Sequence, residues 1–278
     1  MNWWRALALA VRALALLFFA GFFGAPLLWL VLAATRTDYQ LATGPAFAFG
    51  SLGNVARAWH QLDGFGGHLF RRWLVNSMLY TLSATALTLL TAIPAGYGLA
   101  VGRFRGRRLV LSLTVVAMTM PATALVLPIF LELDALHLLG SAFTVILPFA
   151  FFPFGVYLAY LYYVTALPPA LLDAARVDGC GEWTTFRRVA LPLARPLVAL
   201  VCFFSFAADW TNFFLPYVVL PDSSQYPVEV GLSDLLLGGP KAQLALAALI
   251  ATVPPAIVFA ISQRAIGRGL LTGGTTGS

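Results

Sequence analysis

The sequence predicts an all-α integral membrane protein with six transmembrane helices. Of its 278 residues, 60% are hydrophobic and only 10% are charged, which is more apolar surface than one soluble core of this length can bury. The hydrophobic residues also fall into long continuous runs rather than into the in–out alternation of a lipid-facing strand. Helices that use the bilayer as their solvent account for both observations.

A helix that crosses a hydrocarbon core of about 30 Å needs roughly 20 apolar residues. Six segments meet this length, and we expect them to form one transmembrane domain, residues 1–278. The first segment continues beyond the apolar region of a secretory signal without a clear cleavage site, so we expect it to be retained. The segments cover approximately residues 11–34, 73–101, 109–131, 142–165, 197–220 and 242–262.

Proline occurs in each of the second to sixth segments. Each proline removes a backbone donor and tends to kink its helix. Kinked helices suit a pathway that opens alternately to each side, but prolines are also common in membrane helices without such a role. The residues are Pro94, Pro121, Pro128, Pro148, Pro153, Pro216, Pro254 and Pro255.

The positions of the basic residues predict the orientation of the helices. With the N-terminus inside, the outer connections hold five of the 17 Lys and Arg residues, which leaves twelve for the inner side. We therefore expect both termini and the connection at residues 166–196 to lie in the cytosol. The five outer residues are Arg36, Arg57, Arg71, Arg72 and Lys241.

The outer connections differ in pattern. An amphipathic stretch around residues 55–60 predicts a short helix near the membrane surface. The last outer connection, residues 221–241, contains Pro221, Pro227 and Pro240 together with glycine. This composition predicts turns rather than a helix.

The sequence lacks the motifs of several chemistries. It has no phosphate-binding Gly-x-x-x-x-Gly-Lys-Ser/Thr loop, no Gly-x-Ser-x-Gly elbow and no His-Glu-x-x-His pair. His60, His68 and His137 do not have the spacing of metal ligands. We therefore expect neither a bound cofactor or metal nor an enzymatic centre in this chain. The net charge of +6 comes from short basic clusters, which argues against a nucleic-acid partner.

The connection at residues 166–196 is polar and has the signals of two short helices. Pro169 suits a helix start, and Gly179 is placed to end that helix in a left-handed conformation. A second helix is expected around residues 182–189, and Pro192 is expected to stop it. The connection is therefore predicted to be a compact helix–turn–helix.

This helix–turn–helix is predicted to dock on another protein. Asp173 lies in an early turn, where negative charge suits the helix dipole. Ala174 and Ala175 leave a surface shallow enough to enter a groove. A polar, helix-prone element between two long apolar segments must contact something in the aqueous phase, which indicates coupling to a separate protein.

One ionisable residue lies well inside a predicted span. Asp209, in the fifth segment, is costly in hydrocarbon unless it faces the interior of a helix bundle. It either lines a transport path or is a structural carboxylate satisfied by neighbouring helices or water, and the sequence leaves both readings open. Tyr157 and Trp210 could stack on a sugar ring, but aromatic residues in membrane helices more often serve packing or interface anchoring.

The 166–196 connection resembles the EAA signature of the permease subunits of bacterial binding-protein-dependent ABC importers. That pattern reads Glu-Ala-Ala-x-x-x-Gly, followed downstream by hydrophobic-x-Leu-Pro. This chain has Asp in place of the leading Glu, and Cys180 where Ala is usual. The matching residues are Asp173, Ala174, Ala175, Asp178, Gly179, Phe186, Leu191 and Pro192.

Further stretches resemble the sugar-transporting branch related to the maltose importer, in particular its six-helix G-type permease. The fifth segment has Trp210 and Asn212, with Thr211 between them where the family often has Trp-Asn. The other matching stretches include Asn76-Ser77, Gly96-Tyr97-Gly98, Arg103–Arg107, Pro121 with Pro128, and Tyr226–Leu232.

The resemblance implies an ABC type I importer permease that forms half of a translocation pathway for a carbohydrate or a related polyol or glycerol derivative. It implies a second homologous permease as heterodimer partner, two copies of a cytoplasmic ATPase that holds ATP and Mg, and an extracytoplasmic solute-binding protein. The chain would lie in the bacterial inner membrane, surrounded by lipid, and would couple to the ATPase through residues 173–192. The candidate residues of the path are Asp209, Trp210, Asn212 and Tyr157.

Three alternatives remain beside this hypothesis. The same fold could import a non-sugar solute, against which the carbohydrate-type stretches argue. An ion-gradient-driven secondary carrier should transport without an ATPase and should need several buried titratable residues, which this chain mostly lacks. A membrane scaffold without transport would leave the 166–196 connection without a role.

Overall fold

The computed structural model describes residues 3–273, and within this range the chain is helical and contains no strand. The all-α fold class is therefore confirmed. The chain divides into two compact units, each of which is described by itself. The first unit runs to Arg71 and includes Gly231–Thr252, and the second comprises Arg72–Val230 and the chain from Val253 onward.

Several helices have the length and composition of membrane spans. Among the described residues, four helical segments are long and apolar enough to cross a bilayer, and six are if each of two bent helix pairs counts as one span. The protein is accordingly a multi-pass membrane protein. The four segments are α1 (Trp3–Ala34), α4 (Leu69–Val101), the α7–α8 pair (Phe143–Ala166) and α15 (Lys241–Gly273), of which the part up to Arg264 counts as a span.

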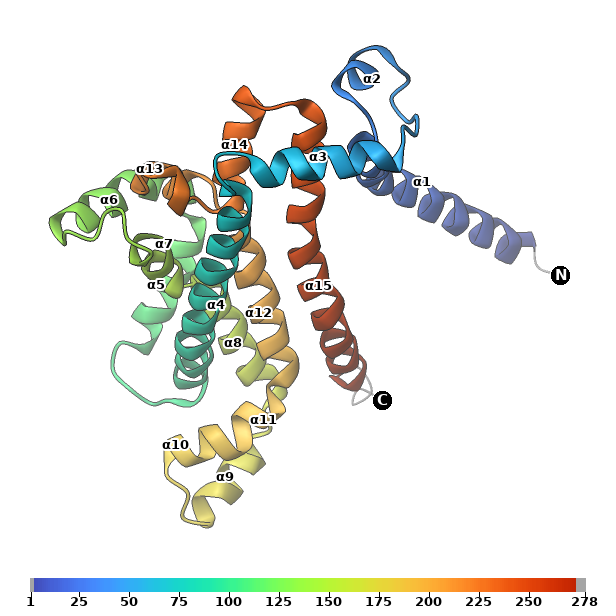
Figure 1. Cartoon of the computed structure of the whole chain (residues 1–278). Coiled ribbons are helices and arrows are strands. Elements are labelled where there is room, and N and C mark those ends of the chain that lie inside the picture. The colour runs from blue at the N-terminus through green and yellow to red at the C-terminus, as the bar shows by residue number, and fades with distance from the viewer. Residues whose placement is uncertain (1–2, 274–278) are drawn as a thin grey trace. The chain divides into compact units, whose positions relative to one another are not determined.

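The first unit contains α1, α2 (Asp38–Thr43), α3 (Leu52–Gly64) and the beginning of α15 (Figure 1). α1 begins at Trp3, earlier than the predicted start near residue 11. α3 includes residues 55–60, so the predicted amphipathic helix is confirmed.

Polar side chains fix the helix starts of this unit. Thr37 and Gln40 form a reciprocal capping box at the start of α2. Asp38 Oδ1 accepts a hydrogen bond of 2.8 Å from the backbone N–H of Ala242 at the start of α15, where a carboxylate also suits the helix dipole. The guanidinium of Arg36, only 3% exposed, donates to the carbonyl of Pro45 at 2.8 Å. The connection after α1 is thus held by polar contacts that the sequence did not reveal.

The connection at residues 221–241 contains a helix that was not expected. α14 (Val228–Gly238) lies between Pro227 and Pro240, so the prediction of turns alone is wrong. Pro227 immediately precedes the helix, where its missing N–H removes no intrahelical hydrogen bond. Proline here marks the start of a helix rather than its interruption.

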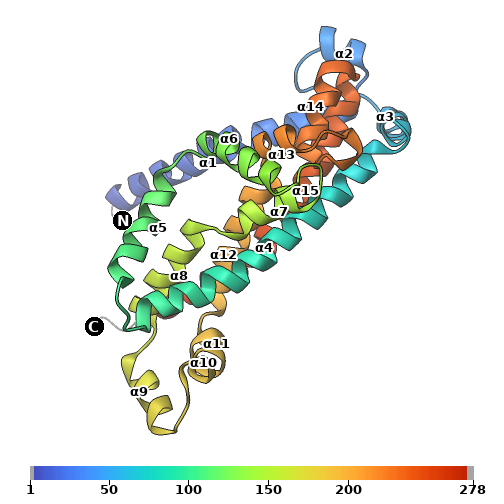
Figure 2. The same cartoon turned by 90° about the vertical axis from the view of Figure 1, so that its left-hand side faces the viewer.

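The second unit is built around α4, α8 (Pro153–Ala166) and α12 (Arg195–Trp210), which run side by side in both views (Figure 1 and Figure 2). α5 (Arg107–Thr119) packs mainly on α8, and α13 (Phe214–Val219) packs on α6 (Ala122–Ala135) and α7 (Phe143–Ala150). One apolar cluster joins α4, α6, α7 and α13. Its buried residues are Tyr80, Ala84, Leu133, Val145, Ile146, Leu215, Val219 and Leu220.

Two predicted continuous spans are interrupted at proline. The segment 109–131 is divided into α5 and α6, which meet at 107°, because Pro121 holds the preceding Met120 in an extended conformation (φ −73°, ψ 126°). The segment 142–165 is divided into α7 and α8, with Phe152 extended immediately before Pro153. The prediction that proline distorts the helix is confirmed for these two segments.

The fifth predicted span is interrupted without proline. Residues 197–220 form α12 and α13, with a break at residues 211–213, whereas Pro216 lies inside α13. Pro94 likewise remains inside α4, and Pro254 and Pro255 remain inside α15. Proline therefore interrupts two spans, and elsewhere it lies inside a helix.

Threonines of α4 satisfy the backbone at one of these breaks. Thr88 Oγ1 donates to the carbonyl of Phe149 and Thr91 Oγ1 donates to the carbonyl of Ala150, both at 2.9 Å. These carbonyls end α7 and have lost their helical partners. In a bilayer an unpaired carbonyl costs several kcal/mol, so the hydroxyls of α4 allow the chain to turn there.

The other end of α4 holds the connection that precedes α14. Asn76 Nδ2 donates to the carbonyls of Ser224 (2.9 Å) and Tyr226 (3.1 Å). Ser77 Oγ accepts the backbone N–H of Val228 at 2.7 Å. Trp73 Nε1 and Tyr80 OH donate to the carbonyls of Ser223 and Gln225 at 2.7 and 3.1 Å. These four side chains recur at helical spacing on one face of α4, so this face fixes a loop that is about 150 residues away in sequence.

α4 and α8 approach each other closely at Gly96. A Cβ added at Gly96 would lie 2.3 Å from Ala159 Cβ and 2.7 Å from the backbone nitrogen of Tyr160. At Gly98, two residues later in α4, an added Cβ would meet nothing within 4 Å. The two glycines of the same helix therefore make a matched pair.

We predict that Gly96→Ala destabilises the protein by about 1–3 kcal/mol, because it overpacks the α4–α8 contact. Gly98→Ala should leave stability unchanged or raise it by up to about 1 kcal/mol, since alanine favours the helix. Thermal unfolding midpoints of the two variants in detergent check this. Equal midpoints would contradict the close approach of α4 and α8.

Candidate functional site

A helical projection extends from the ends of α8 and α12 (Figure 2). It contains α9 (Pro169–Val177), then α10 (Glu182–Thr185), a π-helical turn (Phe186–Ala190) and α11 (Leu191–Leu193). Pro168 is extended and Pro169 occupies the first helical position of α9, as expected for residues that start a helix. The predicted helix–turn–helix is confirmed.

α9 ends in a complete Schellman motif at Gly179. The backbone N–H of Cys180 donates to the carbonyl of Ala175 at 2.9 Å, and that of Gly179 donates to the carbonyl of Arg176 at 3.0 Å. Gly179 has φ +75°, the left-handed conformation that this motif requires. The sequence-based prediction for Gly179 was correct.

The second helix does not end where we expected. It continues through Pro192 to Leu193, so Pro192 does not stop it. Pro192 lacks the N–H that would pair with a carbonyl one turn earlier. The turn just before it is wider, with the N–H of Leu191 bonded to the carbonyl of Phe186, and this π-helical turn keeps the helix continuous.

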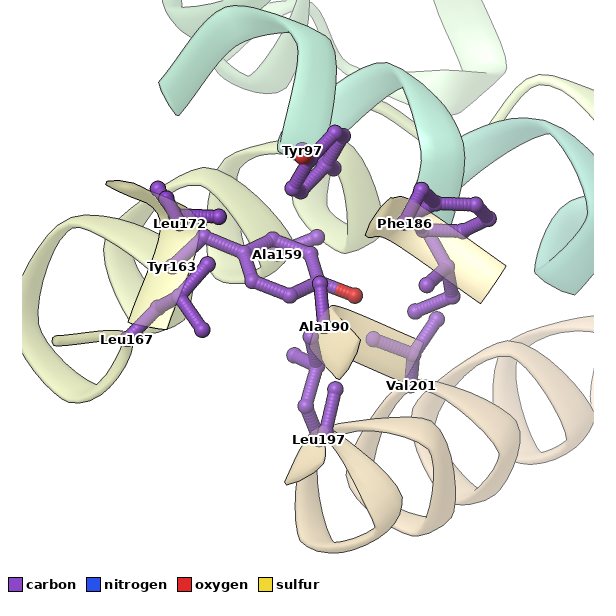
Figure 3. Packing of buried hydrophobic residues seen from close by; sticks show 11 residues of the cluster. Tyr97, Ala159, Tyr163, Leu167, Leu172, Phe186, Ala190, Leu197 and Val201 are labelled. Atoms are coloured by element: carbon purple, nitrogen blue, oxygen red, sulfur yellow. The ribbon is translucent and has the colours of Figure 1, made fainter. Parts of the chain in front are cut away.

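Phe186 anchors the projection to the membrane helices (Figure 3). Its ring is 4% exposed and its centroid lies 5.1 Å from that of Tyr97 on α4. Tyr97 in turn contacts Tyr163 of α8 edge-on, with centroids 5.4 Å apart. One cluster therefore joins α4, α8 and α12 to both helices of the projection. Its other buried members are Ile93, Ala159, Leu167, Leu172, Ala190, Ala194, Leu197 and Val201.

Arg176 joins the two helices of the projection. Its guanidinium lies 3.2 Å from Asp173 Oδ1 on α9 and 3.3 Å from Glu182 Oε1 on α10. The hydrogen bond and charge of Glu182, followed by those of Asp173, raise the pKa of Arg176 above its ordinary value. Tyr97 OH donates to Glu182 Oε2 at 3.5 Å. The side chains are solvated, so these pairs add little stability, although the pair with Glu182 links α9 to α10.

The residues of the signature divide into an inner and an outer set. Ala175 is only 6% exposed, so the expectation that both alanines form the outer surface is wrong for Ala175. Ala174 is exposed. The inner set is Ala175, Phe186 and Leu191, and the outer set is Asp173, Ala174, Asp178, Gly179 and Pro192.

Two exposed apolar side chains lie beside the outer set and were missed in the sequence. Val177 is 88% exposed and Trp183 is 66% exposed. Each is an apolar residue among the polar positions of its helix. This departure from the amphipathic pattern is the sequence signal that could have identified them as exposed. Large exposed apolar residues are typical anchors of a protein interface.

A pocket of about 630 Å³ opens between α4 and the second helix of the projection. Tyr97 and Phe186 form its apolar wall, while Arg103, Glu182 and Trp183 contribute groups that solvent reaches. Arg176 and Trp183 of the projection line this pocket, so it adds concave surface to the projection.

The candidate path residues lie on different parts of the second unit. The half-buried carboxylate of Asp209 accepts hydrogen bonds from Ser205 Oγ (3.3 Å) and Thr85 Oγ1 (3.5 Å). Neighbouring hydroxyls therefore donate to this carboxylate, and the two interpretations of Asp209, path-lining and structural, both stay predictions. Trp210 is 2% exposed, so in this conformation its ring is packing rather than a stacking platform.

Asn212 and Tyr157 have less defined surroundings. Asn212 lies at the break between α12 and α13, and its Nδ2 is buried without a hydrogen-bond partner among the described residues. Tyr157 lies on α8 and its ring stacks on Tyr160 of the same helix at 6.3 Å. The described residues contain no group of three or more His, Cys, Asp or Glu side chains that could hold a metal ion.

Comparison with known proteins identifies the family. Residues 92–272 match the model of the binding-protein-dependent transport system inner membrane component. The arabinooligosaccharide transport system permease AraQ of Bacillus subtilis (strain 168) is 36% identical over 76% of this chain and 76% of its own length. The diacetylchitobiose uptake system permease NgcG of Streptomyces coelicolor is 28% identical over 87% of this chain and 80% of its own length.

A solved structure has the same fold. The crystal structure of a bacterial ABC transporter that imports the acidic polysaccharide alginate contains a chain with a TM-score of 0.79 and 22% identity, over 95% of this chain and 98% of that one. The family match covers the signature and its anchoring cluster, and the resemblance stated from the sequence is confirmed. The chain belongs to the family of binding-protein-dependent transport system inner membrane components.

Proposed function

We propose that this chain is the permease subunit of an ATP-driven importer and that residues 173–192 couple it to a cytoplasmic ATPase. The observation that carries the proposal is the anchored projection. Trp183 and Val177 present apolar surface to the aqueous phase, while Phe186 locks the same helices into α4, α8 and α12. A surface of this kind passes a movement of its partner directly to the membrane helices.

The packing density of the cluster supports this transmission of force. Ala190, Ala194 and Val201 are fully buried, and close-packed interiors move as rigid bodies rather than deform continuously. Closure of an ATPase dimer would therefore rotate the projection together with its spans. The pathway would then change from inward-facing to outward-facing.

The proposed topology has six spans with both termini in the cytosol of a bacterial cell, in the inner membrane. The spans would be α1, α4, α5–α6, α7–α8, α12–α13 and α15. The exposed Arg187 and Arg188 next to α11 favour an aqueous location for α10 and α11. We therefore assign α12 and α13 to one span. The combination of α10–α11 with α12 also has the length and composition of a bent span.

The proposed assembly contains a second homologous permease, two copies of the ATPase and an extracytoplasmic solute-binding protein. The most apolar part of α1 is not buried within the chain, so lipid or the second permease would cover it. ATP and Mg would be held by the ATPase, because this sequence lacks a phosphate-binding loop.

The proposed cargo is a carbohydrate or a related polyol or glycerol derivative. The relatives named for arabinooligosaccharides, diacetylchitobiose and sulfoquinovosyl glycerol support this class. Asp209 and Asn212 are the proposed polar contacts of the path. The buried Nδ2 of Asn212 has no partner among the described residues and would gain one from a hydroxylated cargo.

Co-purification tests the proposal. The intact chain and a variant with residues 173–191 replaced by a Gly/Ser linker are each extracted from their own membranes. An ATPase and a second permease should accompany the intact chain, and the ATPase should be lost with the linker. If no ATPase accompanies either form under conditions that preserve a known importer, a gradient-driven carrier becomes the better description.

We predict that loss of Trp183 reduces ATPase binding, whereas loss of Phe186 reduces the stability of the chain. Trp183→Ala should weaken ATPase binding roughly thirtyfold, since an anchor of about 2 kcal/mol is lost, with little change in thermal stability. Phe186→Ala should destabilise the chain by about 3–5 kcal/mol because it leaves a cavity in the cluster. Affinity and unfolding midpoint are measured for both. Normal affinity in the Trp183 variant would remove it from the interface.

We predict that Gly179→Val abolishes coupled transport without preventing membrane insertion. Valine at φ +75° costs about 1–3 kcal/mol and should displace the turn between α9 and α10. Gly181→Val is the matched control, because Gly181 has φ −69° and an added Cβ there meets nothing within 4 Å. Uptake and ATPase binding are compared, and equal behaviour of the two variants would argue against a functional turn.

The charge of Asp173 gives a separate prediction. Asp173→Glu should retain the ion pair with Arg176 and support normal assembly. Asp173→Lys should place two cations side by side and weaken ATPase docking, measured by the amount of ATPase that co-purifies. Unaltered assembly of the lysine variant would mean that this charge has no role in docking.

A further inference from the structure

The pocket between α4 and the projection contains an arginine that has no ion-pair partner in the described part of the chain. Three charged residues line this pocket: Arg103, Arg176 and Glu182. Arg176 pairs with Glu182, whose other carboxylate oxygen accepts a hydrogen bond from Tyr97 OH at 3.5 Å. Arg103 is exposed and forms no ion pair with any residue whose side chain the structure describes. Its guanidinium is therefore available to a group from outside the chain.

The charges around the pocket favour an anionic partner. Residues 102–108 and 182–190, which contribute Arg103 and Glu182 to the wall, contain six arginines and one acidic residue. The sequence has no Asp or Glu from residue 64 to residue 131, so α4, the turn after it and α5 supply no carboxylate. Complementary charge guides a partner to such a surface and disfavours partners of like charge.

The turn between α4 and α5 fixes the backbone beside Arg103. The N–H of Gly102 donates to the carbonyl of Gly98 at 2.9 Å, and a Cβ added at Gly102 would collide with that carbonyl oxygen. Arg107 closes the turn from its other side, because it donates to the carbonyl of Ala100 at 3.1 Å. An arginine on a fixed turn loses less conformational freedom on binding than one on a mobile loop.

The rest of the wall suits the stem of an inserted side chain. Tyr97, Trp183 and Phe186 line the pocket with aromatic rings. Its volume of about 630 Å³ lies within the range of sites that hold whole ligands, so it has room for a side chain of a partner. A carboxylate-bearing side chain presents its stem to the rings and its two oxygens to the planar guanidinium of Arg103.

We infer that Arg103 is a second contact of the ATPase, outside residues 173–192, and that an aspartate or glutamate side chain of the ATPase enters the pocket to pair with it. The inference rests on the proposed function, because the ATPase is the partner that we place on the projection. Arg103 belongs to the turn between α4 and α5, whereas Trp183 belongs to α10. The ATPase would thus hold two separate segments of the permease.

Arg105 is the matched control for Arg103. It lies on the same turn, is also exposed, and has no ion pair among the described residues, but it does not line the pocket. Basic residues in cytosolic connections also orient membrane helices without binding a partner, and both arginines serve that purpose equally. A difference between their variants therefore reports the pocket rather than general charge.

ATPase binding at low and high salt tests the inference. The full-length chain and its permease partner are assembled in nanodiscs, and the ATPase that co-purifies with them is prepared separately. Its dissociation constant is measured for the original chain, Arg103→Gln, Arg105→Gln and Arg103→Glu. Each acidic residue on the ATPase surface that faces the permease is then replaced by lysine and combined with Arg103→Glu. Unfolding midpoints of the permease variants separate loss of the contact from loss of the fold.

Arg103→Gln should weaken ATPase binding about tenfold at low salt and less at high salt, because salt screens a solvated pair. Arg105→Gln should change the dissociation constant by less than about twofold. Arg103→Glu should weaken binding by about a hundredfold, since it places like charges together, and one lysine variant of the ATPase should restore it. The unfolding midpoints should stay unchanged, because both arginines are exposed.

Three outcomes would contradict the inference. Normal affinity of the Arg103→Gln variant at low salt would remove Arg103 from the interface. Equal weakening by Arg103→Gln and Arg105→Gln would reduce the effect to general charge. Weakening that no lysine variant of the ATPase reverses would mean that Arg103 does not meet a carboxylate. Failure of the original chain to bind any ATPase is distinct from these, since it would overturn the proposed function and this inference with it.

Discussion

The packing of Phe186 beneath Tyr97 is the interaction on which the rest of the second unit depends. It brings the π-helical turn of the projection into a cluster shared by α4, α8 and α12. Burial of a Phe side chain stabilises by about 1.5–3 kcal/mol, far more than the solvated pairs of Arg176. Apolar packing therefore sets the position of the projection, and the ion pairs only refine the angle between its helices.

A second constraint comes from the bilayer, which cannot hydrogen-bond an exposed backbone. The break after α7 leaves carbonyl groups that need partners, and α4 supplies hydroxyl donors for them. Thr88 and Thr91 satisfy the end of α7, while Thr85 contacts Asp209. These hydroxyls make α4 the scaffold against which irregular segments are placed. The same reasoning explains a half-buried carboxylate without requiring a proton-coupled mechanism.

Composition and run length were sufficient to predict an all-helical membrane protein, and local turn chemistry was sufficient for α9 and Gly179. The break at residues 211–213 had no such local signal, because it depends on how α13 packs against α6 and α7. The π-helical turn before Pro192 was also not predicted from the sequence, because the packing of Phe186 in its cluster keeps that helix continuous. Exposure of Trp183 depends on which face of α10 points away from Tyr97. Tertiary packing, which a single sequence does not record, decides each of these.

The two alanines of the signature are small for two different physical reasons. Ala175 is buried on α9, and a larger side chain there would displace α9 from the elements that cover it. Ala174, one position earlier, points to solvent, where a larger side chain meets no such limit inside the chain. A restriction to alanine at position 174 must then come from outside, from a surface that approaches α9 closely. The contrast between these adjacent residues separates the requirements of the fold from those of the partner, because only the requirement at Ala174 should disappear when the ATPase is absent.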